Sequence, residues 1–141
     1  MFFAAGIPYT YSYLNTQIAL YSSLLLKKAS VSFAKSSICK SMCGLDIHLL
    51  SVEPLQFQEN KEKNFIIINT RTHAGETSCS WVLEGILEKI SQSEEVWNWI
   101  NKNNVFLKII PMLNPDGVFM GNYRTGIIGD DFNRKFLSGK K

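Results

Sequence analysis

The sequence predicts an α/β fold with a mixed, mostly parallel sheet flanked by helices. Two short apolar runs, residues 65–68 and 105–110, have the length and composition of buried strands. Segments with a helical apolar period lie before them and between them. Strands that alternate with helices are typical of layered α/β folds. The length of 141 residues corresponds to one domain or to part of a larger one.

The N-terminal half is predicted to contain one helix and one short strand. Between residues 9 and 28 apolar side chains recur at three- and four-residue steps, which indicates a helix. Residues 32–44 are rich in Ser and Lys, follow no clear pattern and end in a Gly turn. The short apolar run 45–52 predicts a strand, and the polar segment 53–63 predicts a loop.

The second half alternates strands and helices. Phe65–Ile68 is a continuous run of mostly β-branched residues, which is typical of a strand buried on both faces. Residues 81–90 have a helical period, and Ser93 is the expected cap of a second, short helix. Residues 105–110 form the next strand. The sequence Asn-Pro-Asp-Gly at 114–117 is a strong turn signal and introduces a long loop.

Composition and charge exclude several classes of protein. The chain is 45% hydrophobic and 19% charged, so it can build a core and is not disordered by composition. Its net charge is +3 and its lysines are scattered, which indicates no nucleic-acid partner. The apolar stretch 18–26 is too short to span a membrane, and residues 1–5 lack the basic start of an export signal. The odd number of cysteines, three, favours a reduced, intracellular setting.

The segment with the most chemical content is Thr72–Thr77, THAGET, directly after the strand predicted at 65–68. His73 and Glu76 lie three positions apart, and imidazole nitrogen and carboxylate oxygen are both zinc ligands. A loop that reverses at Gly75 can direct both side chains toward one point, beyond the carboxyl end of a strand where α/β sheets bind ligands. We therefore predict two zinc ligands. The alternative is a surface Glu beside a His whose hydrogen bonds are satisfied within the protein.

A second group of polar residues lies near the end of the chain. Asn133 and Arg134 are adjacent, and Arg124 lies ten residues upstream. Converging on one pocket, these side chains would bind a carboxylate or polarise a carbonyl. The alternative is that both arginines form surface ion pairs with nearby aspartates. Those aspartates are Asp116, Asp130 and Asp131.

Four segments, in this order, resemble the catalytic domain of zinc metallocarboxypeptidases. They are FFAAGIPYTYSYL (2–14), NTRTHAGETSCSWVLEGIL (69–87), KIIPMLNPDGVFMGNYR (108–124) and GDDFNR (129–134). The chain most resembles the cytosolic carboxypeptidase subfamily, which acts on glutamate-rich tails of tubulin and other proteins. This resemblance implies a carboxypeptidase-like fold, a Zn²⁺ cofactor and a cytoplasmic location associated with the cytoskeleton or with cilia.

The resemblance also implies roles for individual residues. His73 and Glu76 match the first two zinc ligands. Asp131 matches the acidic residue that orients the zinc-binding His. Arg124 matches the arginine that polarises the scissile carbonyl, and the segment 114–117 matches part of the pocket wall.

Asn133 and Arg134 match the pair that binds the C-terminal carboxylate of the substrate. The implied reaction is the removal of C-terminal residues, glutamates in particular, from acidic polypeptide tails such as those of tubulin. In this mechanism zinc activates a water molecule and a Glu takes its proton.

Two parts of the family pattern have no counterpart in the sequence. The third zinc ligand is a later His and the general base is a later Glu, whereas the only other His here is His48, which we expect to be structural or on the surface. We also expect the β-rich domain that precedes the catalytic domain in the subfamily to lie outside residues 1–141. We therefore expect residues 1–141 to be a truncated, partial catalytic domain, incomplete for catalysis.

Two other functions stay open at this point. A zinc amidohydrolase of the aspartoacylase type shares the His-x-x-Glu spacing and the Asn-Arg pair. A remnant that binds tails or partners without cleaving them is consistent with the two missing catalytic groups.

Overall fold

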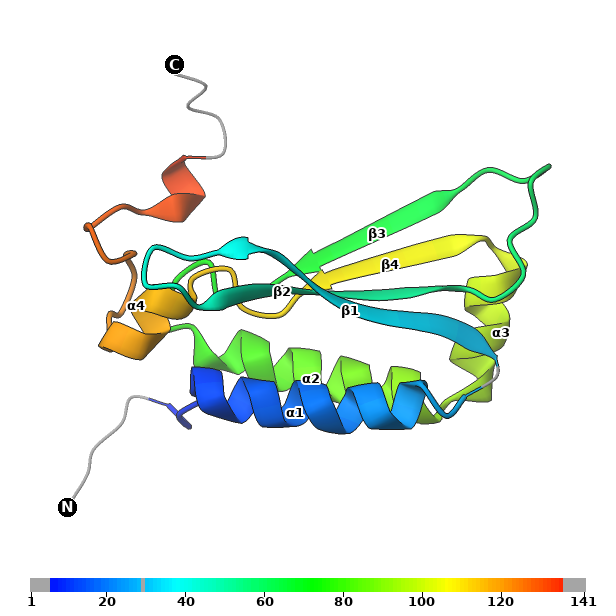
Figure 1. The fold of residues 1–141 in the computed structure, drawn as a ribbon, viewed down its shortest axis with the longest axis horizontal. Helices are drawn as coiled ribbons and strands as arrows, with labels where there is room; N and C mark the ends of the chain where they lie inside the picture. The colour runs from blue at the N-terminus through cyan, green and yellow to red at the C-terminus, as the bar shows by residue number, and fades with distance from the viewer. Residues whose placement is uncertain (1–5, 29, 136–141) are drawn as a thin grey trace.

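A four-stranded mixed sheet with helices against one face makes up the computed structural model, which describes residues 6–28 and 30–135 (Figure 1). The elements in chain order are α1 (Tyr11–Leu25), β1 (Val31–Lys40), β2 (Asp46–Pro54), β3 (Asn64–Asn69), α2 (Thr77–Gln92), α3 (Glu94–Lys102), β4 (Val105–Ile110), α4 (Pro115–Met120) and the 3-10 helix η1 (Phe132–Arg134). The first five residues, considered above as an export signal, lie outside the described residues.

The strand order is β1-β2-β4-β3. β1 pairs with β2 and β2 with β4 in antiparallel fashion, and β3 pairs with β4 in parallel. The mixed α/β class is confirmed. The expectation of a mostly parallel sheet does not hold for this part of the chain, because the Ser- and Lys-rich segment forms β1 and adds an antiparallel hairpin.

β1 is a strand that the sequence pattern did not reveal. It pairs with β2 from Val31 opposite Pro54 to Lys40 opposite Asp46, with a bulge after Ser37. Most of its residues are exposed, so the strand shows no alternation of apolar and polar positions. An edge strand with both faces largely in water leaves little period-2 signal in its sequence.

The helices agree with their predicted positions. α1 lies within the predicted segment 9–28, and its N-terminus is capped by the Thr10 hydroxyl, which accepts from the Tyr13 amide at 3.1 Å. α3 begins after Ser93, whose hydroxyl accepts from the Val96 amide, as predicted. α1 and α2 run side by side beneath the sheet (Figure 1).

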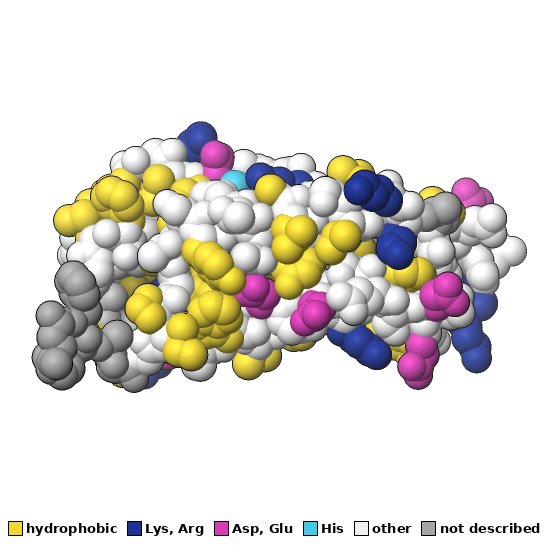
Figure 2. All heavy atoms as spheres, turned by 90° about the horizontal axis from the view of Figure 1, so that it is seen from below, with side chains coloured by type: hydrophobic (Ala, Val, Ile, Leu, Met, Phe, Trp, Pro, Cys, Tyr) yellow, Lys and Arg dark blue, Asp and Glu magenta, His cyan; other side chains and the backbone are white. Residues whose placement is uncertain are grey.

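The core lies between these helices and one face of the sheet. It is built from apolar side chains of α1, α2 and α3 packed against alternate residues of β2 and β4. Its buried members include Leu14, Ile18, Leu25, Leu50, Val52, Leu83, Leu87, Ile100, Leu107 and Ile109. Apolar side chains also reach the outer surface of the helical face, where Figure 2 shows them in several groups with charged side chains between them.

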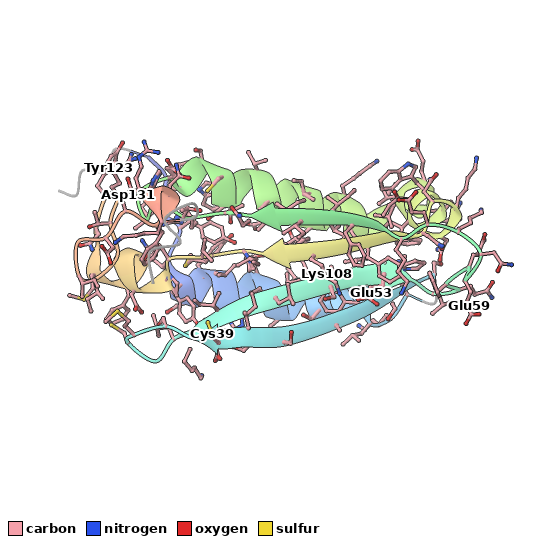
Figure 3. All side chains as sticks on the ribbon, turned by 90° about the horizontal axis from the view of Figure 1, so that it is seen from above. Cys39, Glu53, Glu59, Lys108, Tyr123 and Asp131 are labelled. Atoms are coloured by element: carbon pink, nitrogen blue, oxygen red, sulfur yellow. The ribbon has the colours of Figure 1, made fainter. Side chains whose placement is uncertain are left out.

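β3 departs from its prediction. Phe65 and Ile67 are 60% and 69% exposed, although the apolar run indicated a strand buried on both faces. The physical reason is its position, since β3 is an edge strand with β4 as its single partner in the described sheet. In addition, no described helix covers the face of the sheet opposite α1 and α2. On that face Lys108 of β4 and Glu53 of β2 form an ion pair (Figure 3).

Within residues 6–28 and 30–135, no helix is long and apolar enough to cross a membrane.

Candidate metal centre

The loops after β3 and β4 leave the same end of the sheet, because the two strands are parallel. Three backbone hydrogen bonds tie these loops together. The amide of Thr70 donates to Ile110 O, that of Leu113 to Thr70 O, and that of Asn114 to Arg71 O, each at 3.0 Å. THAGET and the Asn-Pro-Asp-Gly segment therefore lie side by side at the carboxyl ends of the strands, which is the position predicted for THAGET.

His73 and Glu76 face each other in this loop. His73 Nδ1 lies 2.7 Å from Glu76 Oε1, with His73 buried and the Glu76 side chain 55% exposed. Glu76 is the N-cap residue of α2 but makes no side-chain capping bond. Its carboxylate is therefore directed to His73 rather than to the helix amides, and the start of α2 fixes the separation of the two side chains.

Gly75 brings a second loop against this pair. Its amide donates to Tyr123 O at 2.6 Å, and a Cβ at Gly75 would lie 2.6 Å from the same oxygen. A side chain has no room here, so the close approach of the two loops requires glycine. The contact places Arg124, the next residue after Tyr123, beside the loop 70–76 that carries His73 and Glu76, called the metal loop below.

Asp131 connects the two loops through its carboxylate. Its Oδ1 lies 3.2 Å from His73 Nε2 and also accepts from the Asn133 amide at 3.0 Å, while its Oδ2 accepts from Arg124 Nε at 2.8 Å. Desolvation raises the pKa of Asp131, but the hydrogen bonds from Arg124 and His73 outweigh it and hold the pKa below its usual value. Figure 3 shows Asp131 and Tyr123 at the same end of the sheet.

The structure thus joins four of the six predicted site residues in one chain of contacts. Their order is Glu76, His73, Asp131 and Arg124. The ion pair that Arg124 forms with Asp131 agrees with the alternative in which the arginines pair with nearby aspartates. Asn133 and Arg134 lie on η1 with both residues exposed, and their side chains make no hydrogen bond to the other four in the described part of the chain.

The donor atoms fit a zinc ion as a partial set. His73 Nε2 is directed to Asp131, so Nδ1 is the nitrogen that remains for a metal beside the Glu76 carboxylate. Zinc bonded to one nitrogen and one oxygen in tetrahedral geometry separates them by about 3.3 Å, so the observed 2.7 Å requires a small opening of the pair. Among the described residues there is no group of three or more His, Cys, Asp or Glu that could hold a metal. This part of the chain therefore offers two candidate ligands, His73 and Glu76.

His48 has a structural role, as expected. It is buried on β2, with Nε2 2.7 Å from Asn15 Oδ1 and its ring stacked on Tyr11 of α1. Burial lowers its pKa, with Lys35 acting in the same direction. Its ring nitrogen is therefore used to fix α1 on the sheet.

Two buried residues of the turn after β4 hold neighbouring segments in place, a role beyond the pocket wall that the resemblance implies for 114–117. The side chain of Asn114 donates to Thr72 O and Thr125 O, at 3.4 and 3.2 Å, and accepts from the Gly117 amide at 2.9 Å. An Asn directly before Pro at a helix start is a capping signal, so this role was within reach of the sequence.

Asp116 fixes the turn between β1 and β2. It accepts from the Ser41 hydroxyl at 2.6 Å and from the Cys43 amide at 3.2 Å. A predicted turn is therefore a short capped helix that holds three neighbouring segments in place.

Comparison with known proteins agrees with this geometry. Human cytosolic carboxypeptidase 4 is 35% identical over 145 residues, which cover 97% of this chain and 13% of the human protein. Mouse cytosolic carboxypeptidase 6 is 38% identical over 136 residues, which cover 96% of this chain and 24% of the mouse protein. The chain therefore spans a quarter or less of the length of these relatives.

Solved structures show the same fold. A metallo-carboxypeptidase from Burkholderia cenocepacia matches 93% of this chain and 34% of its own with a TM-score of 0.79 at 22% identity. A metallo-carboxypeptidase from Pseudomonas aeruginosa, solved with (2-guanidinoethylmercapto)succinic acid, matches 93% and 32% with a TM-score of 0.72 at 24% identity. Residues 21–140 match the model of the zinc carboxypeptidase family. The chain belongs to the zinc carboxypeptidase family.

Proposed function

We propose that this chain supplies the first part of the active site of a zinc-dependent metallocarboxypeptidase. The observation that carries the proposal is the continuous chain of contacts from Glu76 through His73 and Asp131 to Arg124. His73 Nδ1 and Glu76 hold the metal, and Asp131 orients the imidazole through Nε2. When bound, zinc supplies a Lewis acid and lowers the pKa of a water molecule.

The arginines and Asn133 act on the substrate. Arg124 is 45% exposed, so its guanidinium can donate to a substrate carbonyl while Nε stays on Asp131. Asn133 and Arg134 are exposed on η1, where they are available to bind a free C-terminal carboxylate. A group that recognises the free carboxylate restricts cleavage to the end of a chain.

The substrate class that we propose is a polypeptide with an acidic C-terminal tail, such as tubulin, from which glutamates are removed. This proposal is supported by the relatives named cytosolic carboxypeptidases and by the resemblance of the four motifs to that subfamily. It also favours a cytoplasmic location, close to cytoskeletal or ciliary tubulin.

The domain assignment is part of the same proposal. Residues 1–141 form one portion of a carboxypeptidase catalytic domain, and the third zinc ligand and the general base belong to a part of that domain other than residues 1–141. On this basis the 141-residue chain alone binds zinc weakly and does not turn over substrate. The completed domain binds zinc tightly and turns over substrate.

A non-catalytic binding module is the second candidate, because the described residues supply only two metal ligands. It predicts binding of acidic tails without zinc and without cleavage after completion of the domain. The amidohydrolase alternative has less support, since the relatives reported above are named as carboxypeptidases.

A chimeric domain tests the proposal. Residues 1–135 are joined to the downstream part of the mouse cytosolic carboxypeptidase 6 catalytic domain, zinc content is measured, and release of glutamate from a peptide ending in several glutamates is followed. We expect release that stops with a chelator, with a C-terminally amidated peptide, and in the Arg134→Ala variant. A zinc-loaded chimera that folds but releases no glutamate would contradict the proposal, and cleavage of an N-acyl amino acid instead would favour the amidohydrolase.

A further inference from the structure

Arg71 is a buried cation in the metal loop to which neither the motifs nor the comparisons assign a role. It follows β3 with a left-handed φ of 56° and is 3% exposed. Burial lowers its pKa, although a guanidinium remains charged at neutral pH. A buried charge is costly unless its hydrogen bonds are satisfied, so its partners indicate what the residue is for.

The partners of the Arg71 guanidinium are all uncharged oxygens. Nε and Nη2 both donate to Ala74 O, and Nη1 donates to Tyr9 O at 3.0 Å and to Ser80 Oγ at 3.2 Å. In the described part of the chain no carboxylate forms an ion pair with it. The guanidinium therefore serves as a branched connector of backbone segments rather than as half of a salt bridge.

Half of these contacts fall on Ala74, one of the two residues between the proposed zinc ligands. Ala74 follows His73 directly, and its carbonyl takes two of the four hydrogen bonds. The remaining two bonds reach the segment before α1 and the first turn of α2, which are both packed in the core. The loop is thus tied to rigid elements on its inner side by Arg71, and on its outer side Gly75 is held by Tyr123.

We propose that Arg71 is the positioning residue of the metal pair, and that its fork of hydrogen bonds holds His73 and Glu76 in ligand geometry before the metal binds. The proposal rests on the proposed zinc site. A preformed loop lowers the cost of ordering both side chains at the moment of binding, so the effect should be on zinc affinity. Lysine keeps the charge at this position but lacks the planar fork, and should not replace Arg71.

The test uses the full 141-residue chain and zinc ion as the probe. Zinc affinity is measured by competition with a chromophoric chelator for the wild type, Arg71→Lys and Arg71→Gln. We expect both variants to bind at least about tenfold more weakly, the range found when a residue that orients a metal ligand is removed. Ser80→Ala is the graded variant, because it removes one acceptor and keeps the bonds to Ala74 and Tyr9, so its zinc affinity should fall by less than that of either Arg71 variant.

A core variant shows whether a loss of stability alone, without a change in the loop, lowers the zinc affinity. Leu87→Ala lies on α2 in the core and loses stability without touching the loop, so its zinc affinity under folding conditions should be unchanged. If folded Arg71→Lys and Arg71→Gln bind zinc as tightly as the wild type, the inference is wrong while the zinc site stands. If the wild-type chain binds no zinc, the proposed site itself fails and the inference with it.

A measurement on the wild type covers the case in which the Arg71 variants do not fold. The Nε–H resonance of Arg71 is followed by NMR without metal, with exposed Arg134 as the internal reference. A preformed fork predicts a slowly exchanging Arg71 Nε–H before zinc is added. Exchange as fast as that of Arg134 would overturn the inference.

Discussion

Replacing Asn114 by Ala should destabilise the contact between the loops after β3 and β4, which form the candidate site. The amide side chain of Asn114, 1% exposed, caps α4 through Gly117 and donates to Thr72 and Thr125. Loss of a helix cap costs about 1 kcal/mol, and each of the two lost donor bonds costs roughly another 1 kcal/mol, since the carbonyls stay buried. We expect the free energy of unfolding to fall by roughly 2–4 kcal/mol.

The matched control is Asn122→Ala. Asn122 also donates through its amide to two loop carbonyls, Thr125 O at 3.2 Å and Gly126 O at 3.1 Å, but it is only half-buried. Water can replace its bonds, so we expect a loss of about 1 kcal/mol or less. Both variants are compared by urea unfolding followed by far-UV circular dichroism. An Asn114→Ala variant no less stable than Asn122→Ala would show that the buried Asn114 side chain does not hold the two loops together.

Three further variants test separate contacts. Gly75→Ala should lose about 1–3 kcal/mol of stability in urea unfolding, because its Cβ would collide with Tyr123 O; wild-type stability would contradict the close approach. Asp116→Asn weakens the acceptor of the Ser41 hydroxyl and should raise amide hydrogen exchange in the 41–44 turn, whereas unchanged exchange would show that another contact holds the turn. The folded-state pKa of His48 is lowered by burial, so the stability it contributes is present above about pH 6.5 and is lost as pH falls through that lowered pKa. His48→Gln should flatten this part of the pH–stability curve, and an identical slope in both proteins would assign it to other groups.

The sequence could predict elements whose burial follows one period. β4 was predicted at its observed bounds, 105–110, from the length and composition of its apolar run, and alternate residues of it face the core. α3 followed from the Ser93 cap. β1 was missed because exposure of both faces removes the pattern, and the burial of β3 was overestimated because nothing in a single strand's composition says that it lies at a sheet edge.

In the candidate site, too, features set by local spacing were predictable, whereas features set by the path of a long loop were not. The spacing of His73 and Glu76 and their position after a strand were sufficient to predict that they face each other. Whether Arg124 pairs with an aspartate depended on the path of a long loop, which local pattern does not specify. Arg71 was not identified because arginine is expected at the surface, and its burial is apparent only once the turn is folded around it.

Anomalous diffraction at the zinc edge, from crystals of the 141-residue chain grown with zinc, shows whether His73 and Glu76 hold the metal. We predict a peak at about 2.0–2.2 Å from both His73 Nδ1 and Glu76 Oε1, with Asp131 still bonded to His73 Nε2. Zinc bound through His73 Nε2, or bound only elsewhere on the chain, would contradict it.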